Sequence, residues 1–451
     1  MNRKIVMVAF GSLGDIYPLL AIAERLAKHC NVAFLANEYF KDHIVGRGIE
    51  FHSIGLIEHQ LAARESEDSS GETKQGRKHR FENIIGKSFE RTFEYIERQH
   101  TNGVDITVIT HGNLSPATLA CEKFNIPLIV TYYATSQIPH NGYDMDMYNE
   151  FHGRHSWLSK RILGPLEKLH RLFSFEVESE LNEYRKQYGL APIPSGFRRV
   201  IAKVFPKFLG CRSGVKVNLH IALLPAWFSD PVNRYFPHIE FAGFPFVTEL
   251  QENPPELQEF LERHSNPIVF TPGTAVEDIQ HLCREIIPIC RKLGSPAILV
   301  SKHGRAAFEA LKIPFDVPIQ FIEHVNFEEL LPKVRCLVHH GGIGTTAQAI
   351  RAGIPQIIRP RMYDQPINGL RVMMCGLGGS IPAQEFNADM FANILLHIES
   401  SNIHQERIRH FSDDVKRHNG AAACAKFIMN FIENKDSTND AASANFAAHQ
   451  L

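Results

Sequence analysis

Three observations predict an α/β fold built from two doubly wound, mainly parallel sheets. Short, continuous apolar runs, such as KIVMVAF at residues 4–10, are typical of strands that are buried on both faces. These runs alternate with helical patterns, which is the element order of a doubly wound sheet. The chain has 451 residues, more than a single domain usually contains, so two such domains are expected.

The first domain is predicted to span residues 1–228. Its strands are expected at 4–10, 31–36, 105–110, 127–132 and 218–225. The loop GSLGD follows the first strand, and Pro18 lies in the first turn of the next helix, where proline is well tolerated. The stretch from 135 to 215 breaks the alternation, and we interpret it as an insertion in this domain.

The second domain is predicted to span residues 255–430, after a linker at 229–254 that contains proline and polar residues. Its first strand is the run PIVFTPGT at 267–274, and further strands are expected at AILVS, near IQFIEH, at CLV and at PQIIRP. Residues 435–451 contain few large apolar side chains, so a disordered tail is predicted there.

Composition argues against several classes of protein. A hydrophobic content of 44% and a charged content of 22% are those of an ordinary globular protein, and a formal net charge of −1 gives no overall attraction to nucleic acid. The eight cysteines form no C-x-x-C pair, which argues against zinc sites and a disulfide framework. The chain has no run of about 18 apolar residues and no signal-peptide pattern, so a cytoplasmic protein is expected.

The segment after the apolar run CLV carries the strongest functional signal. Two histidines, three glycines and a threonine follow this run: His339, His340, Gly341, Gly342, Gly344 and Thr345. A helical pattern then continues to residue 352, before a glycine in the C-cap position. A glycine-rich turn between a strand and a helix leaves backbone N–H groups unpaired and directs a helix N-terminus at the loop. This combination binds an anionic group, most often phosphate.

The next strand, PQIIRP, is followed by Asp364 and Gln365, at the end where ligands bind in open α/β sheets. A carboxylate repels phosphate, so this pair suits a neutral polyol whose hydroxyls need hydrogen-bond acceptors and a donor. An alternative is that Asp364 only caps the helix that starts near Pro366. A phosphate-binding loop and a sugar-binding pair at the same edge of one sheet together predict a nucleotide-sugar site.

The strings HHGGIGTT and DQPINGLR resemble the donor-binding signature of the family 1 glycosyltransferases of the GT-B fold. Within that family the sequence is most similar to the bacterial rhamnosyltransferases of rhamnolipid synthesis and to the sterol glucosyltransferases. The stretches GSLGDIYP, LLPAWF, AGFPF and PIVFTPGT support the resemblance. The rhamnosyltransferase pattern has proline at the position of His340, whereas sterol glucosyltransferases carry both histidines, so the donor sugar stays open.

The resemblance implies two Rossmann-like domains that face each other across a cleft, with the last helix crossing back to the first domain. It also implies that the first domain binds the acceptor and that its first loop carries the catalytic base. Asp15 is the only titratable residue of that loop, so we assign it the role of general base, with Ser12 and Gly14 beside the donor. Two alternatives are a plain strand-to-helix turn and a dinucleotide loop that lacks its third glycine.

Further donor contacts are carried over from the family. Gly273 and Thr274 match its second phosphate loop, and His324 and Val325 lie where the family places its contacts to the nucleobase, although a surface histidine is the simpler interpretation of His324. Adjacent histidines at a strand end point to opposite sides, so His339 and His340 do not suit a single metal ion. One is expected to contact the diphosphate, and family position favours His340.

These inferences predict an inverting, metal-independent glycosyltransferase that moves a hexose from a UDP- or dTDP-sugar to a hydroxyl of a hydrophobic small molecule or lipid. No cofactor beyond the nucleotide-sugar co-substrate is expected, and no Asp-x-Asp motif stands at a strand end to hold a metal. The rival interpretations are a nucleotide-sugar epimerase or phosphorylase on the same fold and a non-catalytic nucleotide-sugar-binding protein. No identifiable additional acid–base pair or cofactor lysine supports the first rival.

Residues 197–216 contain six Lys or Arg side chains and no acidic residue, interleaved with phenylalanines. One interpretation is a solvated loop with a few buried aromatic side chains. The other is an interfacial segment that brings the protein to anionic lipid at the inner face of the membrane, where a hydrophobic acceptor would reside. Binding of nucleic acid is not expected, because no recognition motif accompanies these charges.

Overall fold

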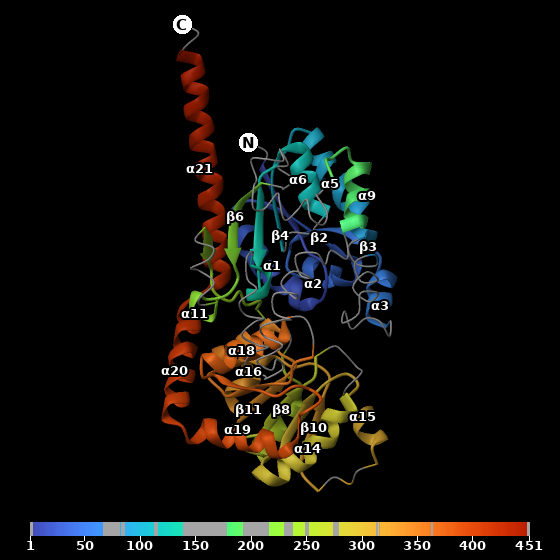
Figure 1. The fold of residues 1–451 in the computed structure, drawn as a ribbon, viewed down its shortest axis with the longest axis vertical. Helices are drawn as coiled ribbons and strands as arrows, with labels where there is room; N and C mark the ends of the chain where they lie inside the picture. Colours follow the sequence, from blue (N-terminus) through green and yellow to red (C-terminus); the bar gives the residue numbers. More distant parts are fainter. Residues whose placement is uncertain are drawn as a thin grey trace, which may run out of the picture.

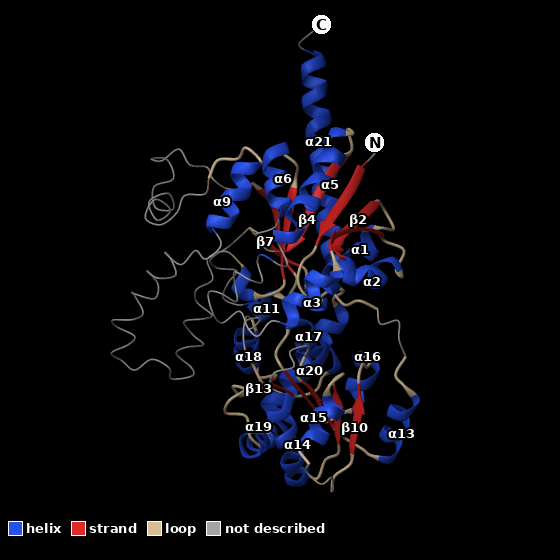
Figure 2. Ribbon diagram, turned by 90° about the vertical axis from the view of Figure 1, so that its right-hand side faces the viewer, coloured by secondary structure: helices blue, strands red, loops and turns tan. Residues whose placement is uncertain are grey.

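The computed structural model describes residues 3–65, 82, 86–111, 116–138, 178–192, 216–229, 238–248, 252–273, 279–312, 314, 316–361 and 364–448. Within these ranges the chain forms two α/β domains that lie one above the other along the long axis of the molecule (Figure 1). Each domain contains one parallel sheet with helices packed against it (Figure 2). The predicted fold class is therefore confirmed.

The first domain is built on a seven-stranded sheet with the order β3-β2-β1-β4-β5-β6-β7. Every pair of neighbouring strands is parallel; in the middle of the sheet, Val6 pairs with Ala33 on one side and with Val108 on the other. The strands are β1 (Arg3–Val8), β2 (Asn31–Asn37), β3 (Glu50–Gly55), β4 (Asp105–His111), β5 (Leu128–Tyr132), β6 (Val217–Ala222) and β7 (Ile239–Phe241).

The second domain is built on a six-stranded parallel sheet with the order β10-β9-β8-β11-β12-β13. In both sheets the chain first adds strands on one side of a central strand and then crosses to its other side. The strands are β8 (Ile268–Thr271), β9 (Ala297–Val300), β10 (Ile319–Ile322), β11 (Cys336–His339), β12 (Gln356–Ile358) and β13 (Gly378–Ser380).

Helices cover both faces of the first sheet. Side chains alternate along each strand, so successive residues pack against helices on opposite faces. Val6 and Val8 pack with α5 and α6, whereas Ile5 and Met7 pack with α1 and the final helix α21. The helices of this domain are α1 (Leu13–Leu26), α2 (Lys41–Val45), α3 (Ile57–Glu65), α5 (Phe89–Thr101), α6 (Pro116–Phe124), α9 (Glu178–Gln187) and α11 (Ala226–Ser229), with 3-10 turns η1 (Glu38–Phe40), η4 (Gly86–Ser88) and η5 (Thr135–Gln137).

The helices of the second domain surround its sheet in the same manner, and the last two leave it. Figure 1 shows α20 running along the side of the second domain and α21 continuing beside the first. The helices are α13 (Pro255–Arg263), α14 (Ile279–Leu293), α15 (Gly304–Ala310), α16 (Phe327–Leu330), α17 (Ile343–Ala352), α18 (Gln365–Met374), α19 (Ala388–Ser400), α20 (Asn402–Arg417) and α21 (Gly420–Ala448), with the 3-10 turn η6 (Leu331–Lys333).

Two boundaries differ from those predicted. Part of the expected linker at 229–254 belongs to the first sheet, because β7 pairs with β6. Its three residues, IEF, are too short a run to be recognised as a strand between prolines. The expected disordered tail also differs, because α21 continues to Ala448. Alanine recurs through the segment AASANFAA, and alanine is the strongest helix former.

The start of α21 lies directly against the segment that joins the two domains. A β-carbon on Gly420 would stand 2.4 Å from the carbonyl oxygen of Phe244 and 2.5 Å from that of Gly243. Only glycine allows so close an approach of two backbones. The crossing helix and the connecting segment are thereby held together where the domains meet.

A second contact between the domains uses the segment LLPAWF. The Trp227 indole N–H donates to Oδ2 of Asp414 on α20 at 2.8 Å. Beside it, the buried guanidinium of Arg371 on α18 donates through Nε to the carbonyl oxygen of Phe228 at 2.7 Å. Both contacts join side chains of one domain to groups of the other, so they fix the relative position of the two sheets.

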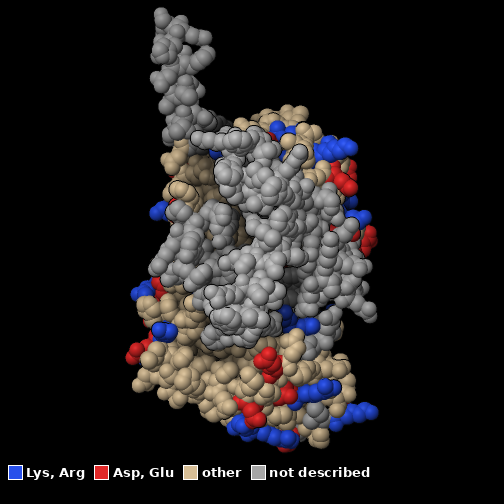
Figure 3. All heavy atoms as spheres, in the orientation of Figure 1, with Lys and Arg blue, Asp and Glu red and all other residues tan. Residues whose placement is uncertain are grey.

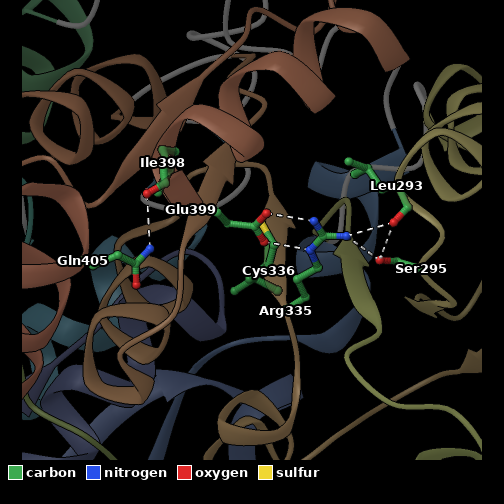
Figure 4. A network of polar contacts seen from close by, with 8 residues as sticks. Leu293, Ser295, Arg335, Cys336, Ile398, Glu399 and Gln405 are labelled. Carbon is green, nitrogen blue, oxygen red and sulfur yellow. Dashed lines mark hydrogen bonds and ion pairs between the residues drawn. The ribbon is translucent and has the colours of Figure 1, made fainter. Parts of the chain in front are cut away.

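The start of β11 is held by a salt bridge at the opposite end of the strand from the glycine-rich loop (Figure 4). Arg335 donates through Nε and Nη2 to the two carboxylate oxygens of Glu399 at 2.7 and 2.8 Å, and through Nη1 to Oγ of Ser295 at 2.7 Å. A bidentate pair of this kind fixes direction as well as distance. It ties the start of β11 to the end of α19.

On the face drawn in Figure 3, positive and negative side chains of the described residues are interspersed over the second domain. This mixture agrees with the formal net charge of −1. Among the helices within the described ranges, none is long and apolar enough to cross a membrane.

We expect Arg371→Met to lower the free energy of unfolding by about 1.5–3 kcal/mol, because it leaves the buried carbonyl of Phe228 without its charged donor. Arg263→Met is the matched control, since its side chain is 70% exposed and its ion pair with Glu259 lies within one helix. Urea denaturation of both variants measures the difference. Equal stability of the two variants would contradict the assigned contact.

Candidate functional site

The predicted site residues lie at the carboxyl ends of strands in both sheets. In the first sheet Asp15 follows β1, His111 ends β4 and Tyr133 follows β5. In an open α/β sheet, ligands bind outside these ends, where the strand order changes direction. That change occurs between β1 and β4 in the first sheet and between β8 and β11 in the second.

Asp15 is the third residue of α1 and closes a capping box with Ser12. Its Oδ2 accepts from the Ser12 backbone N–H at 2.5 Å and from the Ser12 hydroxyl at 3.0 Å, while the Ser12 hydroxyl accepts from Gly14 N–H at 3.2 Å. Such a box satisfies donors that a helix start leaves open. The structural interpretation of Asp15 as a helix-start residue is therefore correct in itself, and a further role must come from its other oxygen.

The other oxygen of Asp15 meets Tyr133, whose hydroxyl donates to Oδ1. The ring of His111 lies 5.5 Å from the ring of Tyr133, centroid to centroid. Burial lowers the pKa of His111, while the nearby charge of Asp15 acts in the opposite direction. The Nδ1 atom of His111 is buried and has no hydrogen-bond partner among the described residues. Asp15, His111 and Tyr133 thus form one cluster at the edge of the first sheet.

A small cavity of about 10 Å³, room for roughly one water molecule, lies between the carboxyl ends of β1, β2 and β3. Phe10, Gly11, Ile54 and Gln60 are among the residues that line it. Gln60 also donates to the carbonyl oxygen of Gly11 at 2.7 Å, which fixes the loop that carries Asp15.

In the second sheet the glycine-rich loop opens α17 as predicted. Gly342 is the N-cap of this helix and provides no side-chain cap, and the first intrahelical bond runs from Thr346 N–H to the Gly342 carbonyl. Gly344 is exposed and Thr345 is partly exposed, so the first turn is accessible. A helix start with backbone N–H groups facing outward suits an anion.

His339 supports this loop from inside. Its ring is buried, its Nε2 pairs with Oε1 of Gln356 at 3.0 Å, and its Nδ1 accepts from Gly341 N–H at 3.1 Å. Both ring nitrogens are therefore used within the protein, and burial lowers the pKa of His339 to about 3. Because the side chain of His339 is occupied within the protein, His340 stays the histidine of the pair that we expect to contact the diphosphate.

His340 points the other way, between two loops. A β-carbon on Gly273 would lie 2.8 Å from its Nδ1, and one on Gly342 would lie 2.6 Å from its Nε2. Both positions must be glycine for the ring to fit, so the ring joins the loop after β8 to the loop after β11. Burial lowers the pKa of His340 to about 4, and its Nδ1 has no hydrogen-bond partner among the described residues.

Asp364 stands in the N-cap position of α18, yet its side chain makes no cap hydrogen bond. Its Oδ2 instead accepts from Nδ2 of Asn368 at 2.9 Å, and the same Nδ2 donates to the carbonyl oxygen of Gly341 at 2.8 Å. Asn368 therefore links the carboxylate to the glycine-rich loop. Gln365 follows at the first helical position, and its Oε1 accepts from the Arg361 backbone N–H at 2.9 Å.

The carboxylates of the two domains lie within electrostatic range of each other. Burial raises the pKa of Asp364 to about 6, and the charge of Asp15 adds to this rise. Burial likewise raises the pKa of Tyr133, with contributions from Asp15 and from Asp364. Asp15, Tyr133 and Asp364 therefore lie near enough to one another, across the two domains, to influence each other's ionisation.

The remaining predicted positions are distributed as follows. Gly273 follows β8 with φ of 82°, a conformation that favours glycine. His324 is exposed and Val325 partly buried in the loop after β10, at the same carboxyl edge of the sheet. Thr274 and residues 197–215 lie outside the described residues. A search of the described residues for groups of three or more His, Cys, Asp or Glu able to hold a metal ion found none.

Comparison with known proteins matches both halves of the chain to families of one kind. Residues 5–131 match the glycosyltransferase family 28 N-terminal domain, and residues 297–429 match the erythromycin biosynthesis protein CIII-like, C-terminal domain. Solved structures agree in fold: the glycotransferase of kitacinnamycin has a TM-score of 0.64 at 15% identity, covering 96% of this chain and 99% of that structure. Each half of the chain therefore matches a domain family of glycosyltransferases, and the fold is that of the GT-B glycosyltransferase structures.

Curated relatives of this glycosyltransferase are distant. The sterol 3-beta-glucosyltransferase UGT80A2 of Arabidopsis thaliana is 24% identical over 85% of this chain and 59% of the relative. The O-mycaminosyltylonolide 6-deoxyallosyltransferase of Streptomyces fradiae is 22% identical over 86% of this chain and 88% of the relative. The sterol 3-beta-glucosyltransferase of Komagataella phaffii matches over 34% of its own length, so the chain spans only part of these sterol relatives. The glycosyltransferase VinC in complex with dTDP has a TM-score of 0.63 at 17% identity, over 96% of this chain and 100% of that one.

Two residues of the glycosyltransferase's site were missed by sequence analysis. Tyr133 lies 118 residues from its partner Asp15, and nothing near it in the sequence marks it. Asn368 could have been found, because it follows Asp364 by four residues in a helix, where side chains share one face. The string DQPIN therefore contained the signal for this pair.

Asp364→Asn should stabilise the free glycosyltransferase at pH 8 by on the order of 2–3 kcal/mol. Asp364 has a folded pKa of about 6 against 3.8 as its ordinary value, so its ionisation opposes folding fully above pH 6 and not at all below about pH 4. The gain should accordingly disappear as the pH is lowered through this window. Asp413→Asn on the exposed side of α20 is the control. Melting curves from pH 4 to 8 measure the gain in stability of each variant. A gain for Asp364→Asn that does not change with pH would contradict the burial of this charge.

Proposed function

We propose that this protein is an inverting, metal-independent hexosyltransferase that uses a UDP- or dTDP-sugar and a hydrophobic acceptor with a hydroxyl group. The observation that carries the proposal is that Asp15 of the first domain lies within electrostatic range of Asp364 of the second, whose sheet also carries His340 and the open helix start of α17 at its carboxyl edge. The first domain contributes a group able to take a proton. The second contributes groups suited to a sugar and to a diphosphate.

The donor would lie along the carboxyl edge of the second sheet. The N–H groups at the start of α17 and the ring of His340 would hold the diphosphate, with Gly273 allowing close approach from the other loop. Asp364 and Gln365 would accept from and donate to the sugar hydroxyls. His324 and Val325 would face the nucleobase. The structurally similar VinC binds dTDP, which supports a dTDP- or UDP-sugar as the donor of this protein.

The reaction would proceed by direct displacement. Asp15 takes the proton of the acceptor hydroxyl while the acceptor oxygen forms a bond to the anomeric carbon. The bond from that carbon to the diphosphate oxygen breaks, and the nucleoside diphosphate leaves with the electron pair. Attack from the side of the first domain, opposite a leaving group held by the second, inverts the anomeric configuration.

The leaving diphosphate gains negative charge, which must be balanced. The start of α17 and a protonated His340 would supply that balance without a metal ion, because a helix N-terminus and an imidazolium are both positive at the required place. The diphosphate would itself favour protonation of His340, against the burial that lowers the pKa of this ring to about 4 in the free protein.

The acceptor would enter from the first domain. Relatives named for transfer to sterols and to O-mycaminosyltylonolide support a hydrophobic acceptor. We retain the proposal that residues 197–216, which carry six basic side chains, bring the protein to anionic lipid. The rival proposal is a non-catalytic nucleotide-sugar-binding protein, and detection of sugar transfer in an activity assay would exclude it.

His340→Ala should weaken binding of UDP or dTDP and remove the rise in affinity that we expect as the pH falls from 7 to 5. The rise is expected because a protonated ring attracts the diphosphate more strongly. His339→Ala should instead lower the melting temperature, since it leaves Gln356 and the Gly341 N–H without their partner. Calorimetry and melting curves on both variants measure these effects. The reverse pattern would show that His339 is the contact.

Asp15→Asn should reduce transfer by roughly 10²–10⁴-fold, the range for loss of a general base, with little change in donor affinity. Mass spectrometry of an acceptor panel, supplied with UDP-glucose and dTDP-rhamnose, measures transfer. Asp42→Asn, an exposed aspartate at the start of α2, is the control. Near wild-type transfer by Asp15→Asn, with unchanged pH dependence, would reduce Asp15 to a helix-start residue. The base would then be sought at His111.

A further inference from the structure

The hydrogen bonds of Asp15 distinguish its two carboxylate oxygens. An ionised carboxylate offers about four lone-pair positions, two on each oxygen. Oδ2 accepts from both the backbone N–H and the hydroxyl of Ser12, at 2.5 and 3.0 Å. Both positions of this oxygen are therefore used by the capping box.

The space around Oδ2 is also closed. A β-carbon placed on Gly11, which has a φ of 110°, would lie 2.2 Å from Oδ2 and 2.8 Å from the carboxylate carbon. The backbone of Gly11 thus lies directly against this side of the carboxylate. An acceptor hydroxyl has no room to reach Oδ2 from there.

Oδ1 is in a different position. Among the described residues its hydrogen-bond donor is the hydroxyl of Tyr133, which occupies one of its two lone-pair positions. We propose that Tyr133 is a positioning residue of the transfer reaction: its hydroxyl holds Oδ1 of Asp15 so that the remaining lone pair of this oxygen takes the proton of the acceptor. This inference rests on the proposed function and adds to it the identity of the reacting oxygen.

Tyr133 is itself held firmly enough to do this. Its backbone N–H donates to Oε1 of Gln137 at 3.3 Å, and its ring packs against His111 and against the core clusters on both faces of the first sheet. Burial and the charges of Asp15 and Asp364 raise the pKa of its hydroxyl, so it stays a proton donor to Oδ1 at neutral pH. It positions the base and does not exchange the reacting proton.

The titratable groups that face Asp15 come from three elements. His111 ends β4, Tyr133 follows β5, and Asp364 precedes α18 in the second domain. A donor to the ionised carboxylate favours its charged form. Removal of the Tyr133 hydroxyl should therefore move the acidic limb of kcat to higher pH, while His111 and Asp364 stay in place.

Tyr133→Phe removes the hydroxyl and keeps the ring. We expect kcat to fall about 10–100-fold, the scale of one lost hydrogen bond to a charged group. KM for the nucleotide-sugar should change less than about twofold, and the acidic limb of kcat against pH should move upward by about one pH unit. Steady-state kinetics from pH 5 to 9 measure all three quantities.

Tyr132→Phe is the matched control on the same segment. Tyr132 is fully buried and its hydroxyl pairs with Nδ1 of His220 at 2.7 Å, away from Asp15. This variant loses a buried hydrogen bond too, but its acidic limb should stay where it is. An unmoved limb in Tyr133→Phe, or an equal movement in Tyr132→Phe, would overturn the proposal.

A readout without turnover separates this inference from the proposed function. The melting-temperature changes of Asp15→Ala and Tyr133→Phe should be non-additive in the double variant, because each change alone removes the bond that the two side chains share. Additive changes would overturn the contact on which the inference depends. If the wild-type protein transfers no sugar while the two changes are non-additive, the proposed function fails and the positioning of Asp15 by Tyr133 stands.

Discussion

The site described here exists only while the two sheets keep their relative position, and a few contacts at one junction determine that position. Trp227 of the first domain donates a hydrogen bond to Asp414 on α20. The carbonyl oxygen of Phe228 accepts one from Arg371 on α18. Each sheet contributes half of the functional groups at its own carboxyl edge. A shift at the junction would therefore separate Asp15 from Asp364 without disturbing either sheet. In this architecture the geometry of the candidate site is a property of the interface between the domains.

The second domain holds two groups in unfavourable surroundings. Burial opposes the charged forms of both Asp364 and His340, with pKa values of about 6 and 4. A core built for stability alone would replace such groups or pair them. Their retention beside an open helix start fits a site whose electrostatic balance is completed by a charged, hydroxyl-rich ligand.

Sequence analysis located ten of the thirteen described strands and the glycine-rich loop, because these depend on local patterns; it did not include β3, β7 or β13. It favoured His340 over His339 only by family position, whereas the surroundings of the two rings depend on Gln356 and Gly273, which lie 17 and 67 residues from them. Tyr133 was missed for the same reason. The strand β7 was missed because three residues carry too little periodicity, and the extent of α21 because polar residues there outweighed its alanines.

The last helix gives this protein an unusual order of assembly. Cys424, Ala425, Ile428 and Ile432 of α21 belong to the same apolar cluster as α1 and the middle of β1. During synthesis the first domain emerges early, yet one side of its core stays uncovered until more than 400 residues have left the ribosome. Apolar surface of this kind promotes aggregation while it waits. The apolar core on this side of the first domain is thus complete only after the second domain has been made, which couples one half of the protein to the synthesis of the other.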